Sequence, residues 1–236
     1  MKYKQNIIRG VLLRRYKRFL ADVELEDGTV LTVHTPNTGA MLGCAEPGSK
    51  VWLYESDNPK RKYPWSWFLV ENDQATKIGI NTSVANRLVE EAINNGVITE
   101  LQGYQKCRRE VKSASGESRF DLFLEGHPQR PDCFVEVKSV TAVDGEGVAI
   151  FPDAVSTRGT KHLVDLQGMI KLGYRGCLVF CVQREDVHAI RAAVEIDPDY
   201  AAALHEAASH GVEILAYVAD ISPEKIELVR PLSVLL

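Results

Sequence analysis

Residues 1–80 alternate between apolar and polar positions in short runs that are separated by turn sequences. None of these runs has the 3.6-residue repeat of an amphipathic helix. Runs rich in β-branched and aromatic residues cover 7–16, 20–28, 29–35, 50–56 and 66–73. Five short strands in so small a unit predict a closed barrel, and an OB-like five-stranded barrel fits the pattern. That fold commonly binds nucleic acids on one face, although periodicity alone does not separate it from other small barrels.

The pattern changes at Asn81, after which strand-like and helix-like segments alternate. Apolar residues at helical spacing predict helices over 83–96, 160–173 and 199–209. Strand-like segments cover 103–113, 118–126, 133–141, 177–183 and 212–221. Strands that alternate with helices predict an α/β sheet that helices cover on both faces. The sequence therefore predicts two domains, a barrel over residues 1–80 and an α/β domain over residues 81–236.

The composition is that of an ordinary globular protein, with 45% apolar and 25% charged residues among 236. No run approaches the roughly 18 consecutive apolar residues that a membrane span needs. The basic N-terminus lacks the apolar core of a signal peptide. Five cysteines without a Cys-x-x-Cys pair indicate reduced thiols rather than disulfides or a zinc site. These features predict a cytoplasmic protein without a membrane partner.

The net charge of −4 is unevenly distributed along the chain. Residues 1–80 carry twelve Lys and Arg against nine Asp and Glu, a balance of +3. Residues 81–236 carry sixteen against twenty-three, a balance of −7. A phosphate backbone responds to the local patch rather than to the total, so the barrel is the predicted nucleic-acid-binding part.

Three charged residues on two neighbouring predicted strands carry the strongest chemical signal. Asp121 lies in the segment 118–126, and Glu136 and Lys138 lie in the segment 133–141. Residues i and i+2 of a strand share a face, and a hairpin would bring Asp121 beside Glu136. A Glu-x-Lys pair is also common on solvent-facing sheet edges, but apolar neighbours place these charges on interior strands. Converging carboxylates suit Mg²⁺ or Mn²⁺, and a lysine beside them can stabilise charge that develops on phosphorus.

Other acids are candidates for the same site. Asp132 lies about 13 Å along the strand from Glu136, so it is interpreted as a turn residue. Asp153, in the predicted loop before the second helix, can still reach the site. The first helix carries Glu90 and Glu91, either of which would complete a metal site by pointing inward. Glu91 is the predicted ligand, although the pattern leaves the choice between the two open.

Basic residues gather in three places. In the barrel they interleave with aromatic residues, an arrangement in which cations bind the backbone and aromatic faces stack on bases, although a solvated hairpin tip gives the same pattern. The predicted nucleic-acid-binding residues there are Arg14, Arg15, Lys17, Arg18, Lys60, Arg61 and Lys62. Near the N-terminus of the second helix, where backbone N–H groups favour phosphate, the predicted residues are Arg158, Lys161 and His162. A histidine there is also compatible with a surface or core position.

Three segments resemble the sugar fermentation stimulation protein A family. They are HTPNTGAML at residues 34–42, EVKS at 136–139 and the long string FPDAVSTRGTKHL at 151–163. The resemblance spans the whole chain and implies an OB-like domain followed by a domain similar to PD-(D/E)xK nucleases. It also implies cytoplasmic DNA binding with little sequence preference, linked to regulation of sugar (maltose) metabolism.

The resemblance also implies roles for individual residues. Asp121 matches the metal-binding aspartate of the nuclease-like pattern, Glu136 the second acid and Lys138 the lysine. Glu91 would match a helix-borne glutamate and Gln167 a later helical glutamine. The proline of the motif's name is replaced by phenylalanine here, which leaves the metal ligands intact. Many proteins with this fold bind without cutting, so the family resemblance does not imply turnover.

Two functions follow as hypotheses. The first is a DNA-binding protein of little sequence preference that retains the cluster without turnover. The alternative is a Mg²⁺- or Mn²⁺-dependent DNA nuclease that uses Asp121, Glu136 and Lys138, with Gln167 as a further catalytic residue. A sugar-metabolising enzyme has no supporting site in the sequence. The strandedness of the nucleic acid and the oligomeric state do not follow from it either.

Overall fold

The computed structural model describes residues 1–3, 6–113, 116 and 118–236. Its N-terminal strands are β1 (Ile7–Tyr16), β2 (Leu20–Leu25), β3 (Val30–His34), β4 (Lys50–Glu55), β5 (Trp65–Glu71) and β6 (Lys77–Gly79). β1 pairs with β2 and β4, β2 pairs with β3, and β4 pairs with β5. A parallel bridge from His34 to Ser66 closes the ring between β3 and β5. The predicted OB-like barrel is confirmed, and β6 is an additional strand that extends it beside β5.

The barrel closes around alternate side chains of its strands. Leu12, Val23, Val33 and Val51 are fully buried inside it. Gly10 allows β1 and β2 to come close, because a Cβ atom there would lie 2.5 Å from Val23 Cγ1. The two-residue period of strands thus produces the core that the sequence pattern predicts.

The larger sheet has the order β14-β13-β11-β9-β8-β7. Its strands are β7 (Lys106–Lys112), β8 (Arg119–Glu125), β9 (Cys133–Val140), β11 (Arg175–Val182), β13 (Glu213–Ile221) and β14 (Ile226–Pro231). The central strands β9, β11 and β13 run parallel, whereas β7, β8 and β14 pair antiparallel to their neighbours. A small parallel sheet beside it contains β10 (Val148–Phe151), β12 (Ala189–Ala192) and β15 (Ser233–Leu235).

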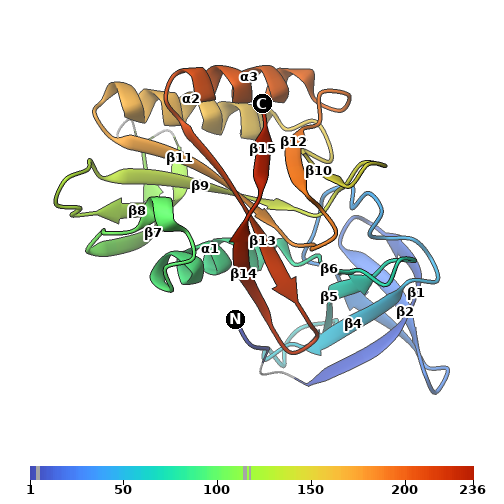
Figure 1. Ribbon diagram of the computed structural model, residues 1–236. Helices are drawn as coiled ribbons and strands as arrows, with labels where there is room; N and C mark the ends of the chain where they lie inside the picture. Colours follow the sequence, from blue (N-terminus) through green and yellow to red (C-terminus); the bar gives the residue numbers. More distant parts are fainter. Residues whose placement is uncertain (4–5, 114–115, 117) are drawn as a thin grey trace.

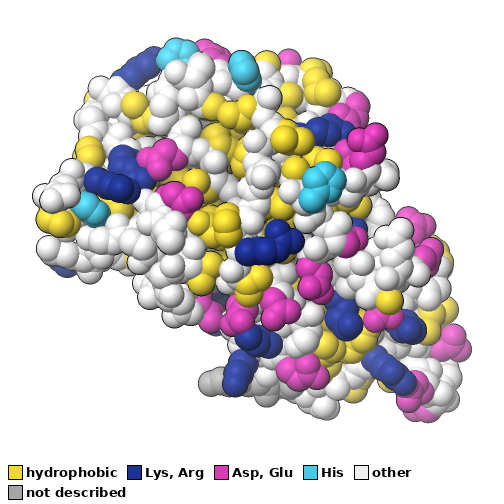
Figure 2. All heavy atoms as spheres, viewed as in Figure 1, with side chains coloured by type: hydrophobic (Ala, Val, Ile, Leu, Met, Phe, Trp, Pro, Cys, Tyr) yellow, Lys and Arg dark blue, Asp and Glu magenta, His cyan; other side chains and the backbone are white. Residues whose placement is uncertain are grey.

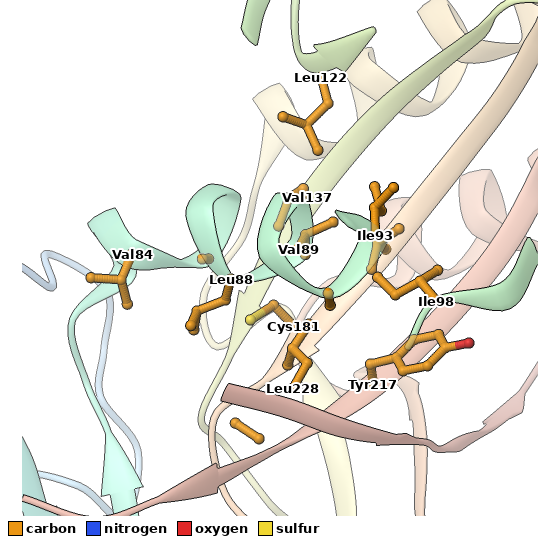
Figure 3. Packing of buried hydrophobic residues seen from close by; sticks show 14 of the residues in the cluster. Val84, Leu88, Val89, Ile93, Ile98, Leu122, Val137, Cys181, Tyr217 and Leu228 are labelled. Carbon is orange, nitrogen blue, oxygen red and sulfur yellow. The ribbon is translucent and has the colours of Figure 1, made fainter. Parts of the chain in front are cut away.

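Helices cover both faces of the larger sheet, as the alternating pattern predicts. α2 (Thr157–Lys171) and α3 (Pro198–Ser209) lie on one face, and α1 (Ala85–Asn94) lies on the other (Figure 1). Two short 3-10 turns, η1 (Thr82–Val84) and η2 (Thr99–Leu101), flank α1. The apolar stripe of α1, with Leu88, Val89 and Ile93, packs against residues of the sheet such as Val137 (Figure 3).

Several element boundaries differ from the sequence prediction. α2 begins at Thr157, three residues earlier than predicted, because Ser156 caps it by accepting a hydrogen bond from the Gly159 N–H. Asn81, where the sequence pattern changes, caps the 3-10 turn η1 that leads into α1. The segment around residues 148–151, predicted as loop, contains β10. In the part of the chain that the structure describes, no helix is long and apolar enough to cross a membrane.

Candidate metal and nucleic-acid site

Asp121 lies where β8 and β9 stop pairing. The ladder between these strands runs as far as Leu122 and Val135. One position further, Asp121 Oδ2 accepts a hydrogen bond of 2.8 Å from the Val137 N–H, so the carboxylate replaces a ladder partner. The predicted hairpin thus brings Asp121 to the strand that carries Glu136 and Lys138.

Glu136 is buried, with 3% of its surface exposed. Its Oε1 accepts a hydrogen bond of 2.7 Å from Lys138 Nζ and also contacts His162 Nδ1 on α2. Its Oε2 is buried and has no hydrogen-bond partner among the described residues. A buried carboxylate oxygen without a donor is costly, so this atom fits a cation.

The electrostatics of the two carboxylates differ. Burial, and then the charge of Glu136, raise the pKa of Asp121 to about 6. Hydrogen bonds from Val137 and Asn86 oppose this shift without cancelling it. Burial also disfavours the charge of Glu136, but the His162 hydrogen bond and the Lys138 charge outweigh it and lower the pKa of Glu136. Glu136 is therefore held as an anion, and its charge destabilises that of Asp121.

The donor set fits a hard divalent cation. Two carboxylates of this kind suit Mg²⁺ or Mn²⁺. Within the described ranges, no group of three or more His, Cys, Asp and Glu side chains is assembled as a metal site. Asp121 and Glu136 would hold the cation together with water or substrate oxygens, since Mg²⁺ usually keeps several such ligands.

Neither predicted helix glutamate joins this pair. Glu91 Oε1 accepts a hydrogen bond of 2.9 Å from the N-terminal amine of Met1. Glu90 pairs with Arg109 on β7. The residue of α1 that reaches the site is Asn86, whose Nδ2 donates to Asp121 Oδ1 at 2.7 Å. The helix therefore contributes an amide that positions Asp121 in place of the predicted third carboxylate.

The other predicted residues on α2 have different surroundings. His162 is buried with 6% exposure, and its Nε2 accepts a 3.4 Å hydrogen bond from Arg158 Nε while its Nδ1 contacts Glu136. It therefore positions Glu136 and is not free to bind a nucleic-acid backbone as predicted. Lys161 is exposed and pairs with Asp165 at 2.6 Å. Gln167 is buried, but no hydrogen bond joins it to Asp121, Glu136 or Lys138 among the residues described.

The two remaining acids also lie in defined contacts. Asp132 Oδ1 accepts a hydrogen bond of 2.8 Å from the Gly126 N–H in the connection between β8 and β9, which is the turn position expected of it. Asp153 Oδ2 accepts one of 3.0 Å from the Met41 N–H of the barrel. Asp153 therefore links the two parts of the molecule.

A cleft of about 290 Å³ opens beside the carboxylate pair, between the barrel and the larger sheet. Lys138 and Asn86 line it from the sheet and α1, Thr38 lines it from the barrel, and Asp153 lines it from the loop after β10. The three sequence segments that carry the family resemblance, residues 34–42, 136–139 and 151–163, thus all contribute to the lining of this cleft. The structure therefore brings together segments that lie far apart in the sequence.

Family models match both parts of the chain. The model for the sugar fermentation stimulation protein RE domain matches residues 83–225, and the model for the SfsA N-terminal OB domain matches residues 13–80. The chain belongs to the sugar fermentation stimulation protein family. The resemblance stated from the sequence is therefore confirmed.

Relatives of the family match over nearly the whole chain. The sugar fermentation stimulation protein homolog of Thioalkalivibrio sulfidiphilus is 55% identical over 234 residues, 99% of this chain and 98% of its own. The homolog of Citrifermentans bemidjiense is 54% identical over 236 residues and the whole of both chains. The solved structure of Pyrococcus furiosus SfsA in complex with Ca²⁺ superposes with a TM-score of 0.86 at 27% identity, covering 100% of this chain and 98% of that one.

In the barrel, the predicted basic residues of this family member divide into two groups, and the first is held by contacts within the fold. Arg14 pairs with Asp22 at 2.8 Å, and Arg61 Nη1 donates to Ser66 Oγ at 2.9 Å. Arg15 Nη2 donates to the carbonyl oxygens of Arg18, Asn37 and Gly39, so it holds the barrel loop that borders the cleft.

The second group consists of four predicted cations that are exposed and form no salt bridge with any described residue. They are Lys17, Arg18, Lys60 and Lys62. On the face shown in Figure 2, Lys and Arg side chains lie next to Asp and Glu over both the barrel and the sheet, without one large basic patch. Any nucleic-acid affinity on this face would therefore depend on a few individual cations.

Proposed function

We propose that the chain binds DNA with little sequence preference and holds Mg²⁺ or Mn²⁺ between Asp121 and Glu136. The observation that carries the metal site is the buried Glu136 Oε2, which has no hydrogen-bond partner among the described residues. The charge of Glu136 also raises the pKa of Asp121, so a cation between the two carboxylates would relieve their repulsion. The Ca²⁺ complex of the Pyrococcus furiosus relative supports the site, because Ca²⁺ also prefers oxygen ligands.

The DNA-binding part of the proposal rests on the barrel and on charge. OB-like barrels commonly bind nucleic acids, and this one carries the four exposed cations of the second group. Lys17 and Arg18 stand at the tip of the β1–β2 hairpin, while Lys60 and Lys62 lie between β4 and β5. The family name refers to sugar fermentation, and DNA binding would connect the chain to the expression of genes for sugar (maltose) metabolism.

Phosphodiester hydrolysis is the second candidate, and the position of Lys138 favours it. Only 13% of the Lys138 side chain is exposed, and its Nζ lies 2.7 Å from Glu136 Oε1. A bound Mg²⁺ or Mn²⁺ would act as a Lewis acid on a phosphate oxygen. Lys138 would stabilise the charge that develops on phosphorus as a water oxygen bonds to it and the bond to the leaving sugar oxygen breaks. The water's proton would pass to solvent, and the leaving oxygen would take up another.

Calorimetric titration of Mn²⁺ tests the metal site. The wild type should bind with a measurable heat that Asp121→Ala abolishes, whereas Asp132→Ala, a matched change of a nearby turn aspartate, should bind as the wild type does. Equal heats for wild type and Asp121→Ala, or no heat for the wild type, would remove the site from the proposal.

Cleavage and binding are tested separately. Labelled DNA incubated with the wild type and Mn²⁺ should yield product that Glu136→Gln and Lys138→Met do not yield, while both variants still bind DNA in anisotropy measurements. Equal traces of product from all three proteins would leave binding as the function. A wild type without affinity for DNA at low salt would contradict the proposal.

A further inference from the structure

The cleft between the barrel and the larger sheet is continuous with the carboxylate–lysine site. Lys138 lines it, and so does Asn86, whose side chain donates to Asp121. A molecule in the cleft would therefore lie against Lys138 and Asn86, whose side chains donate hydrogen bonds to the two carboxylates proposed to hold the metal. The volume of about 290 Å³ is near the lower end for small-molecule pockets, which gives room for about one nucleotide and not for a base pair.

The lining of the cleft matches the chemistry of a nucleoside. Ala142, Ile150 and Phe151 provide apolar surface, which suits the faces of a base. Thr38, Thr82 and Ser139 provide hydroxyl groups. Thr82 Oγ1 already donates to a backbone carbonyl oxygen and Ser139 Oγ already accepts from Gln183 Nε2, so toward a base edge or a sugar Thr82 can accept a hydrogen bond and Ser139 can donate one. The mixture is unlike a purely cationic groove that follows a backbone.

Two charged residues of the cleft would determine the orientation of a bound nucleotide. Lys138 supplies a cation beside Asp121 and Glu136, where a phosphate group would lie. Asp153 supplies a carboxylate, which repels phosphate and accepts hydrogen bonds from amino or hydroxyl groups. A nucleotide with its phosphate at Lys138 and its sugar or base toward Asp153 would place its negative charge beside the ammonium and its hydrogen-bond donors beside the carboxylate.

The barrel wall of the cleft is fixed from both sides. Arg15 donates to the carbonyl oxygens of Asn37 at 3.1 Å and Gly39 at 2.9 Å. From the other domain, Asp153 accepts a hydrogen bond from the Met41 N–H at 3.0 Å, and Thr82 Oγ1 donates to the Pro36 carbonyl oxygen at 3.1 Å. The loop is therefore anchored in place before any ligand binds.

We infer that this cleft takes one unpaired nucleotide next to the phosphate at Lys138, so that the chain acts on single strands or unpaired ends rather than on intact duplex. This inference rests on the proposed function and names its substrate class. An intact duplex would have to unpair and flip a nucleotide to reach the same position, which disfavours it.

The test compares wild type with Thr38→Trp, which fills the cleft from an exposed position of its wall. Thr29→Trp is the matched control, since Thr29 lies at the opposite end of β3 in the β2–β3 turn. With Ca²⁺ present to prevent turnover, anisotropy would measure binding of a labelled single strand, a blunt hairpin duplex and the same hairpin with an unpaired end. Calorimetry with Mn²⁺ and melting temperatures would show that the metal site and the fold are intact.

Wild type and Thr29→Trp should bind the single strand and the unpaired end at least about tenfold more tightly than the blunt duplex. Thr38→Trp should lose that preference while it keeps the Mn²⁺ affinity and melting temperature of the wild type. With the wild type, a deoxynucleoside monophosphate should displace the labelled single strand at lower concentration than inorganic phosphate does. With Thr38→Trp, the nucleotide should displace the strand no better than inorganic phosphate.

The outcomes separate this inference from the proposed function. If wild type binds DNA and Mn²⁺ but prefers blunt duplex, or if Thr38→Trp keeps the preference for single strands, the nucleotide cleft is refuted and the proposed function stands. If Thr38→Trp has a lower melting temperature than the wild type, the smaller substitution Thr38→Leu should be used instead, and it should also lose the preference for single strands. If wild type binds neither DNA nor Mn²⁺, the proposed function fails and the inference fails with it.

Discussion

At the residue scale, the surroundings of Asp121 disfavour its charged form. Burial and the neighbouring Glu136 raise its pKa to about 6, from an ordinary value of about 3.9. A carboxyl group whose pKa is raised by folding holds its proton more tightly in the folded state. The protein therefore loses stability as the pH rises through that interval and reaches the full penalty above about pH 6. Such a penalty is common where a site is built for a ligand.

Replacing Asp121 by asparagine should consequently stabilise the metal-free protein at pH 8. A shift of this size corresponds to at most about 3 kcal/mol, and the loss of one hydrogen-bond acceptor leaves an expected gain of about 1 kcal/mol. Urea unfolding with a chelator at pH 8 and pH 5 would measure it. At pH 5 the wild-type carboxyl is mostly protonated, so the gain should shrink. An Asp121→Asn protein that unfolds more easily at pH 8 would show that the charge supports the fold.

Arg15 and Arg14 are adjacent in sequence but differ in their contacts. Arg15 donates to three backbone carbonyl oxygens, whereas Arg14 is 71% exposed and pairs with Asp22. Arg15→Lys should cost about 1–2 kcal/mol of unfolding free energy, because an ammonium cannot reproduce the guanidinium fork. Arg14→Lys should change that free energy less, because the Arg14 side chain is exposed and an ammonium can still pair with the buried Asp22, which also accepts hydrogen bonds from Tyr16 and Thr32. Equal losses in thermal or urea unfolding would contradict the assignment of Arg15 to the loop.

At the element scale, the tip of the β1–β2 hairpin combines strain with charge. Lys17 and Arg18 have φ values of 50° and 65°, in the left-handed region that Asn and Gly adopt more easily. Positive φ values let a tight turn match the right-handed twist of its two strands. The residues in these positions are nevertheless two exposed cations. Strain of this kind, about 1 kcal/mol or more per residue, is often kept where function needs the side chain.

Replacing Lys17 by asparagine together with Arg18 by glycine should therefore stabilise the barrel by about 1 kcal/mol and weaken DNA binding. A Lys17→Gln, Arg18→Gln double variant is the control, because it removes the charges and keeps the strained turn. It should bind DNA as weakly as the first variant without the gain in stability. If Lys17→Asn with Arg18→Gly binds DNA as tightly as the wild type, the tip has no part in binding.

Elements with a strong local pattern could be predicted from the sequence, and those that depend on distant contacts could not. The five barrel strands and the apolar stripe of α1 follow from periodicity, and so does the hairpin that brings Asp121 to Glu136. β10, β12 and β15 have only three or four residues each, too few for a period, and depend on pairing with one another. Local sequence carries no signal for such contacts.

Two residues of α1 show that the sequence could not predict the whole site. Asn86 reaches Asp121, but a single asparagine in a helix has no pattern that marks it in advance. Glu91 points to the N-terminal amine of Met1, ninety positions away in the sequence, so its direction depends on tertiary structure. The spacing of acids could identify the carboxylate pair but not the residue that orients it.

At the scale of the whole molecule, the charge is divided between a barrel of +3 and a remainder of −7. The acidic remainder repels a phosphate backbone, and the barrel attracts it through its exposed cations. The cleft lies at the boundary between the two parts. A strand bound on the barrel would therefore be guided toward the junction, since the outer surface of the larger domain disfavours it.

DNA affinity should fall steeply with salt, with a slope set by the exposed cations of the barrel. If Lys17, Arg18, Lys60 and Lys62 each neutralise one phosphate of a single strand, the logarithm of the association constant should fall with a slope of about −3 against the logarithm of salt concentration. Lys60→Gln with Lys62→Gln should reduce that slope by about half and weaken binding at low salt, while Lys161→Gln, whose cation already pairs with Asp165, should change it little. Anisotropy titrations between low and moderate salt would measure both slopes. A wild-type slope near zero would show that binding does not depend on phosphate contacts, and an unchanged slope in the double variant would exclude the loop between β4 and β5 from the interface.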